Sequence, residues 1–153
     1  MDRIEHEICA ILQNNARLSN KELAAEVGLS PSSCHERVKK LWERGVLTGV
    51  HASISPEAFG INLEAVVQIR LSRHVRDDVE GFIAHLDKLK EVLAYYHVTG
   101  EFDYIVHVAV KNQDHLRDFA LDAFTAREEV SQILTSLVFQ SKIQKSMPCF
   151  LDF

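Results

Sequence analysis

A tight break between two short amphipathic helices constrains the fold of this chain more than any other sequence feature. Ser19 begins a capping box that Glu22 completes, and the short apolar stripe behind it stops at Gly28, a residue suited to the left-handed end of a helix. Ser30 and Pro31 then supply the N-cap and the first position of the next helix. Two helices joined by so short a turn predict a helix-turn-helix, whose second helix enters the major groove of DNA.

A third helix precedes this pair, and a short β segment follows it. Asp2 and Glu5 form another capping box at the start of an apolar stripe. Residues 46–52 are expected to form a short strand, which predicts a winged helix-turn-helix domain over residues 1–52. A proline and a glycine then mark residues 53–62 as a linker between two domains.

The last of the three helices carries a polar and basic face opposite its apolar stripe. Hydrogen-bonding side chains suit the edges of bases, and cations suit phosphates. We expect base contacts from Ser32, Ser33, His35 and Glu36, phosphate contacts from Lys39, Lys40 and Arg44, and either kind of contact from Arg37. A charged outer face is also common on helices that never touch DNA, so this face alone leaves both interpretations open.

The charge distribution is compatible with a polyanionic partner although the chain is acidic overall. The net charge is −5, from 17 basic and 22 acidic side chains. Residues 1–50 hold seven of each sign, so the whole deficit lies after residue 50. A local basic cluster can bind phosphate because salt screens charges beyond roughly 8–10 Å.

Composition excludes several other classes of protein. A hydrophobic content of 46% and a charged content of 25% exclude a disordered chain, and no apolar run is long enough to cross a membrane. Three widely spaced cysteines argue against a disulfide framework and predict a reducing, cytoplasmic environment.

From residue 63 onward the pattern alternates between strands and helices. The expected elements are a strand at 63–71, a helix at 79–89, strands at 92–99 and 104–110, a helix at 116–124 and a strand at 130–139. This β-α-β-β-α-β order predicts a ferredoxin-like sandwich over residues 63–153 and an α+β protein as a whole. Apolar residues also alternate onto the face of the sheet without helices, so we expect a homodimer and further association. The apolar residues 147–153 are expected to pack as well.

Together these motifs resemble the Lrp/AsnC ("feast/famine") family of transcriptional regulators. The resemblance is carried by residues 19–24, 27–31 and 45–47, and by the Gly-Glu-Phe-Asp-Tyr run at 100–104. It implies sequence-specific binding of double-stranded DNA by the winged helix-turn-helix and a ferredoxin-like effector domain that dimerises through its sheet. It further implies that dimers assemble into octamers or related rings, and that an amino acid or a similar metabolite binds between the effector domains of neighbouring dimers.

The same resemblance implies where the effector binds. By this match Gly100 lets backbone N–H groups approach the ligand carboxylate and Asp103 receives its α-ammonium, which are the two partners that a zwitterion needs. The expected effector contacts are Val98, Thr99, Gly100, Glu101, Phe102, Asp103, Tyr104, Thr135 and Ser136. Many family members carry two threonines at alternating positions of the last strand, whereas the first position here is Ile133. An ordinary hairpin turn favours the same loop residues, so that alternative stays open.

Two other functions remain open on the sequence. Sirohaem decarboxylases resemble this family in plan but have a degenerate helix-turn-helix, whereas the capping signals here are intact and the basic run 73–76 suits a solvated turn. The other alternative is an architectural DNA-binding protein without an effector. We expect no enzyme activity, no catalytic residue and no cofactor. We also expect no metal site, because His6 and Cys9, three residues apart, make only two ligands.

Overall fold

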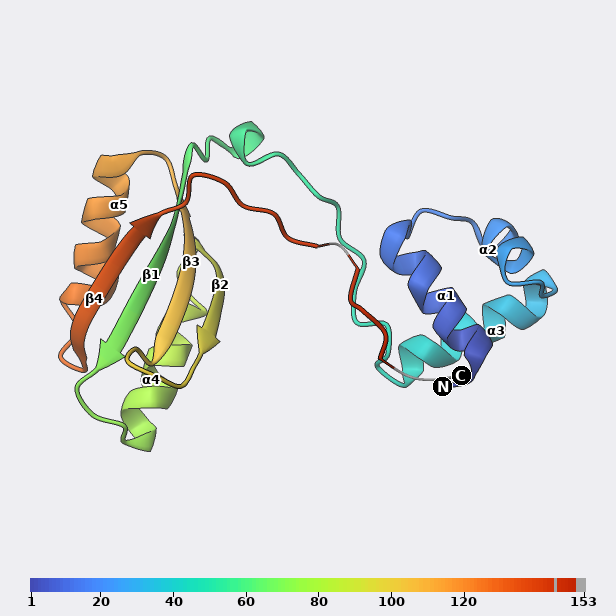
Figure 1. Ribbon diagram of the computed structural model, residues 1–153, viewed down its shortest axis with the longest axis horizontal. Helices are drawn as coiled ribbons and strands as arrows, with labels where there is room; N and C mark the ends of the chain where they lie inside the picture. Colours follow the sequence, from blue (N-terminus) through green and yellow to red (C-terminus); the bar gives the residue numbers. More distant parts are fainter. Residues whose placement is uncertain (145, 151–153) are drawn as a thin grey trace. The chain divides into compact units, whose positions relative to one another are not determined.

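The computed structural model describes residues 1–144 and 146–150, and the chain divides into two compact units (Figure 1). The first unit holds Met1–Ser53 together with the C-terminal segment that begins at Lys142, and the second unit is Ile54–Ser141. The first boundary lies next to the expected end of the DNA-binding domain. The expected boundaries assigned the C-terminal segment to the second domain, at residues 63–153. In the structure this segment groups with the first unit and not with the sheet.

The first unit is built from three helices around a small core. The helices are α1 Arg3–Asn14, α2 Asn20–Glu26 and α3 Pro31–Glu43. The buried apolar side chains of this core are Ile8, Leu23, Ala24, Val27, Cys34 and Leu41. These are residues of the three stripes that the sequence predicts.

The caps expected from the sequence hold the helix ends. Both capping boxes form, with the Asp2 and Ser19 side chains accepting from the backbone N–H three residues on. Ser30 caps α3 by accepting from Ser33 N at 3.2 Å. Gly28 adopts a φ of 66°, the left-handed conformation that lets the chain turn between α2 and α3.

Residues 46–52 do not form the expected strand. The backbone N–H groups of Val46 and Leu47 both bond to Leu41 O, which closes the end of α3, and the rest of the segment is irregular. A strand needs a neighbour to bond to, and the described residues of the first unit provide none. The prediction of a wing strand is therefore wrong for the single chain.

The second unit is the expected β-α-β-β-α-β sandwich. Its elements are β1 Leu63–Leu71, α4 Arg76–Leu86, β2 Val92–His97, β3 Tyr104–Val110, α5 Gln113–Ala120 and β4 Val130–Leu137. A short 3-10 turn, Pro56–Phe59, precedes β1, and a π-helical turn, Leu121–Thr125, extends α5. The strands lie in the order β2-β3-β1-β4 and every neighbouring pair is antiparallel, which is the ferredoxin-like arrangement.

One face of this sheet is buried under the helices and the other is open. Alternate residues of β1 and β3 pack against Phe82 of α4 and Phe119 of α5. On the open face Gln68 of β1 lies between Ile105 and Leu134 of the flanking strands. Leu134 is 49% exposed there, so a single chain leaves part of this face uncovered.

Candidate DNA interface and effector site

The helix-turn-helix presents one side of α3 away from the first unit. Cys34 and Leu41 are fully buried beneath α3, and Asn20 Nδ2 donates to Pro31 O at 2.7 Å, which fixes the start of α2 against the start of α3. The core and this polar contact together hold α3 in one orientation. The residues that the sequence assigned to DNA then fall on three sides of the helix.

Four of the eight expected DNA contacts share the side of α3 that points away from Cys34. By the 3.6-residue period of a helix, this set is Ser32, Glu36, Lys39 and Lys40. All four are exposed, and the nearest charge pair is a loose one between Lys39 Nζ and Glu43 Oε1 at 3.8 Å. This group is open to a ligand approaching α3 from outside, and we call it the outer side of α3.

Two arginines lie on the side of α3 that faces α1, where acidic residues hold them. Arg37 Nη1 donates to Asp2 Oδ2, and Arg44 Nη1 donates to Glu5 Oε1 at 3.0 Å. The hydrogen bond from Arg37 lowers the pKa of the Asp2 carboxyl below its ordinary value. Each guanidinium has five N–H donors. The N–H groups that do not bond to Asp2 or Glu5 are left to donate to a phosphate.

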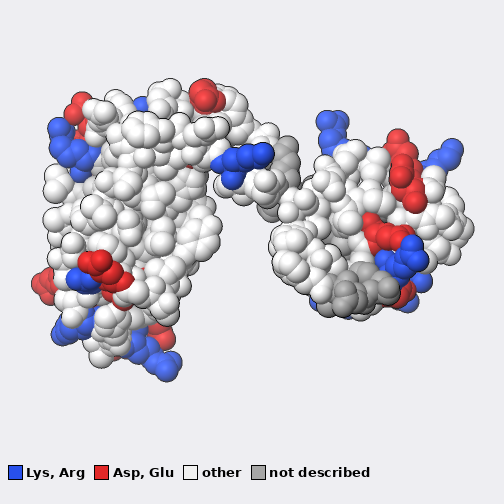
Figure 2. All heavy atoms as spheres, viewed as in Figure 1, with Lys and Arg blue, Asp and Glu red and all other residues white. Residues whose placement is uncertain are grey.

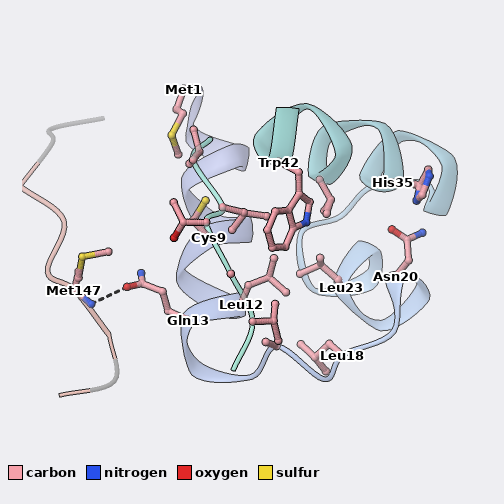
Figure 3. A pocket seen from close by; sticks show the side chains of 17 residues that line it. Met1, Cys9, Leu12, Gln13, Leu18, Asn20, Leu23, His35, Trp42 and Met147 are labelled. Carbon is pink, nitrogen blue, oxygen red and sulfur yellow. Dashed lines mark hydrogen bonds between the residues drawn. The ribbon is translucent and has the colours of Figure 1, made fainter. Parts of the chain in front are cut away.

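His35 lies on the opposite side of α3, at the rim of an apolar groove within the first unit (Figure 3). The groove has a volume of about 460 Å³ and lies between α1, α3 and the segment after α3, with Leu12, Leu23 and Trp42 among its walls. Trp42 is 42% exposed there. His35 is therefore set apart from the outer side of α3.

The serines at the start of α3 form a small hydrogen-bonded cluster. Ser30 Oγ donates to Ser33 Oγ at 2.9 Å and lies 3.1 Å from Ser32 Oγ. The cluster lies at the N-terminus of a 13-residue helix, where unpaired N–H groups favour anions.

On the face in view in Figure 2, basic and acidic side chains are interleaved on both units.

The loop between β2 and β3 is tied to the end of β1 through Asp103. Asp103 N donates to Ile69 O at 2.9 Å, and Asp103 Oδ2 accepts from Leu71 N at 2.7 Å. Asp103 Oδ1 accepts from His74 Nε2 at 2.6 Å. Burial raises the pKa of Asp103, but the hydrogen bonds from His74 and Leu71 outweigh burial, so the net direction is downward.

Arg70 holds the rest of the loop. Its Nε donates to Glu101 O at 2.6 Å, its Nη2 lies 3.1 Å from Glu101 Oε1, and its guanidinium lies 5.5 Å from the centre of the Phe102 ring. Gly100 has a φ of 126°, a backbone conformation that residues other than glycine rarely adopt. Sequence reasoning missed Arg70 and His74. The available signals were the alternation of polar and apolar residues along β1, which includes Arg70, and the acidic residues of the loop, which need donors.

Thr135 and Ser136 do not share a face of the sheet. Thr135 pairs with Val67, on the helix-covered face, whereas Ser136 pairs with Val66, on the open face. Ile133 pairs with Ile69, the residue that also pairs with Tyr104 at the base of the loop. Successive residues of a strand point to opposite faces, so the expected grouping of these two hydroxyls around one ligand does not hold within a chain.

The part of the chain that the structure describes contains neither a membrane-spanning helix nor a metal-binding cluster. No helix within residues 1–144 and 146–150 is long and apolar enough to span a membrane. In the same residues, no group of three or more His, Cys, Asp or Glu side chains is arranged to hold a metal ion.

Comparison with known proteins covers both units. Residues 1–48 match the winged helix-turn-helix DNA-binding family, and residues 64–148 match the Lrp/AsnC ligand-binding domain. The HTH-type transcriptional regulator AldR of Mycolicibacterium smegmatis is 36% identical over 140 residues, which cover 92% of this chain and 82% of that protein. The leucine-responsive regulatory protein of Salmonella typhimurium is 33% identical over 146 residues, which cover 95% and 89%.

A solved structure extends the likeness to the whole fold. A transcriptional regulator from Neisseria meningitidis in complex with L-Met has a TM-score of 0.90 and 33% identity, and the match covers 97% of this chain and 96% of that one. A helix-turn-helix with an exposed outer side and a ferredoxin-like ligand-binding unit define a DNA-binding transcriptional regulator. The chain belongs to the Lrp/AsnC family of such regulators.

Proposed function

We propose that this regulator reads its operator with the outer side of α3. The observation that carries the proposal is the exposure of Ser32, Glu36, Lys39 and Lys40 above the fully buried Cys34. Ser32 and Glu36 lie in the N-terminal half of α3, where hydrogen-bonding groups reach base edges, and the lysines follow toward phosphates. In a dimer, two such helices fit successive major grooves about 34–36 Å apart on a roughly palindromic site.

Binding by a duplex that the wild-type protein selects from a randomised pool tests this proposal. Lys40→Gln is expected to weaken binding and to reduce the slope of log affinity against log salt by about one, because one phosphate contact is lost. Lys111→Gln, an exposed change in the second unit, is the matched control. Equal affinities and salt slopes for all three proteins would remove the outer side of α3 from the interface.

We propose that the effector is an amino acid that binds at the loop between β2 and β3. The L-Met complex of the Neisseria meningitidis regulator supports this class of ligand. Asp103 offers a carboxylate for an α-ammonium group, and a ligand would compete with His74 for Oδ1. The expected contacts from Val98 to Asp103 lie on this loop, whereas Tyr104 begins β3 and is fully buried. Thr135 lies two residues beyond Ile133 on the helix-covered side of the sheet.

The effector would act by changing assembly or the spacing of the recognition helices. A typical coupling between two sites is about 1–3 kcal/mol, which would change DNA affinity several-fold or more. Oligomers are typical of the family, and we propose that dimers form on the open face of the sheet and assemble further to an octamer. Leu134→Glu should then lower the mass measured by light scattering, because it places a charge on that face.

The decarboxylase-like alternative has no supporting feature in the basic run 73–76. Arg73 pairs with Asp78, His74 with Asp103 and Arg76 with Glu80, so its charged side chains are engaged within the unit. We therefore propose regulation without catalysis. Stable binding and turnover of a carboxylated tetrapyrrole, followed by its absorbance, would contradict that proposal.

A further inference from the structure

Two cysteines from opposite ends of the chain line the same surface cavity of the first unit. Cys9 lies on α1, Cys149 lies in the C-terminal segment, and the cavity between these two parts has a volume of about 590 Å³. The segment is anchored where Met147 N donates to Gln13 Oε1 at 2.7 Å (Figure 3). Neither cysteine belongs to the outer side of α3 or to the loop between β2 and β3.

The anchor sets a register that brings the two cysteines to one level of α1. Cys9 precedes Gln13 by one helical turn, a rise of about 6 Å on the same face. Cys149 follows Met147 by two residues, which span about 7 Å in an extended chain. The cavity is lined by residues of α1 from Arg3 to Asn14 and by the C-terminal segment, so Cys149 lies along the same stretch of α1 as Cys9.

We propose that Cys9 and Cys149 are a thiol pair that closes an intramolecular disulfide when the protein meets a peroxide. Such a bond requires the two Cα atoms to come within about 4.4–6.8 Å. Cys149 lies in an exposed segment that is tied to α1 two residues away, at Met147. The described residues offer no three-ligand metal site that would use these thiols instead. The third cysteine, Cys34, is fully buried in the core and takes no part.

The reaction proceeds in two balanced steps. The exposed Cys149 attacks the peroxide as thiolate, the O–O bond breaks, and the products are a sulfenic acid and hydroxide, which takes up the proton that the thiol released and becomes water. Cys9 then attacks the sulfenic sulfur, the S–O bond breaks, and the disulfide forms with release of a second water. Cys149 is exposed whereas Cys9 is only partly exposed, so Cys149 is the thiol that the peroxide reaches first. Burial, followed by the Glu5 carboxylate, also raises the pKa of the Cys9 thiol.

The closed bond would join the C-terminal segment covalently to α1 within the first unit. The chain leaves this unit after Ser53 and returns to it after Ser141, so the disulfide would close a covalent ring that includes the whole second unit. A disulfide at Cys9 would make that return permanent under oxidising conditions. The DNA-binding unit would then be restrained at α1 by the state of two thiols.

Peptide mapping of the full-length protein after peroxide treatment tests the proposal directly. The reduced protein is treated with hydrogen peroxide, free thiols are alkylated, and the digest is analysed without reduction. We expect a linked peptide pair that joins Cys9 to Cys149, in monomeric chains on a denaturing gel, with a yield that does not change on dilution. Absence of this pair, or disulfides only between chains, would overturn the proposal.

Two variants separate the steps and one serves as control. In Cys9→Ser a 1,3-diketone trap should label the sulfenic acid of Cys149, and the linked peptide should be lost. In Cys149→Ser both the linked peptide and any label on Cys9 should be lost at the same peroxide dose. Cys34→Ala should keep the linked peptide at the wild-type yield. Labelling of Cys9 in Cys149→Ser would contradict the order of the steps.

Discussion

Arg44, just past the end of α3, donates to Glu5 in the first turn of α1 at 3.0 Å. Glu5 is only 8% exposed and also accepts from Asp2 N in the capping box, so a single carboxylate closes α1 and receives the end of the recognition helix. This contact joins residues 39 positions apart in the chain. The orientation of α3 against α1 therefore depends on a charge pair as well as on the apolar core.

Removing Arg44 should destabilise the first unit. Arg44→Ala leaves the Glu5 carboxylate largely buried without its charged partner, and we expect a loss of about 1–2 kcal/mol in the free energy of unfolding. Arg3→Ala removes an exposed ion pair on the same helix and should change stability by less than about 0.5 kcal/mol. Urea denaturation followed by Trp42 fluorescence measures both. Equal midpoints would show that the pair contributes nothing.

Arg37 should contribute to DNA binding beyond its contact with Asp2. Arg37→Ala is expected to weaken operator binding, because it removes a cation beside the outer side of α3. Asp2→Asn breaks the same ion pair but leaves the guanidinium free for a phosphate, so binding should be kept or strengthened. Fluorescence anisotropy with a labelled duplex compares the two variants. The same weakening in both would assign Arg37 to the helix cap alone.

Asp103 should be needed for the effector response and not for DNA binding itself. Asp103→Asn keeps an acceptor for Leu71 N but loses the negative charge that an ammonium group requires. The amino acid that gives the wild-type protein its largest thermal shift should give the variant none. Affinity of the ligand-free protein for DNA should stay within about twofold. An unchanged ligand isotherm would exclude Asp103 from the site.

The same carboxylate should make the second unit sensitive to acid. Hydrogen bonds from His74 and Leu71 hold the pKa of Asp103 below its ordinary value of 3.8, against the effect of burial. The stabilisation is therefore fully present above about pH 4 and is lost as the pH falls through the lowered pKa of the folded state. Urea midpoints measured from about pH 5 to pH 3 should fall more steeply for wild type than for Asp103→Asn. Parallel curves would contradict this account.

Two glycine-to-alanine changes should move stability in opposite directions. Gly100 has a φ of 126°, so Gly100→Ala should cost about 1–2 kcal/mol although the added Cβ has open space. Gly81 lies within α4 with similar open space and an ordinary backbone, so Gly81→Ala should stabilise by about 0.5–1 kcal/mol. Thermal unfolding compares the two. A neutral Gly100→Ala would mean that the loop relaxes easily.

Local rules account for what the sequence predicts well. The capping boxes at Asp2 and Ser19 each involve two residues three positions apart, and the alternation in β1 fixes which side faces the helices. Such patterns are complete within one element, because helices and strands have fixed periods. The strand order follows from the order of the elements and their short connections.

The rest depended on partners that are distant in the chain or absent from it. The contacts from Arg37 and Arg44 to α1, and from Asp103 to His74, join residues 29 to 39 positions apart. The strand expected at 46–52 lacked a partner in the single chain. The separation of Thr135 from Ser136 was available from the period of a strand and was overlooked.

The attachment of Asp103 to Leu71 N has a mechanical consequence. Leu71 ends β1, one of the two inner strands, and the pairing with β4 shifts register between Arg70 and Leu71. A displacement of the loop therefore pulls on the backbone of β1 at the point where its ladder is already irregular. Through β1 the strain would pass to strands on both sides, so that an event at the tip of one hairpin is felt across the width of the sheet.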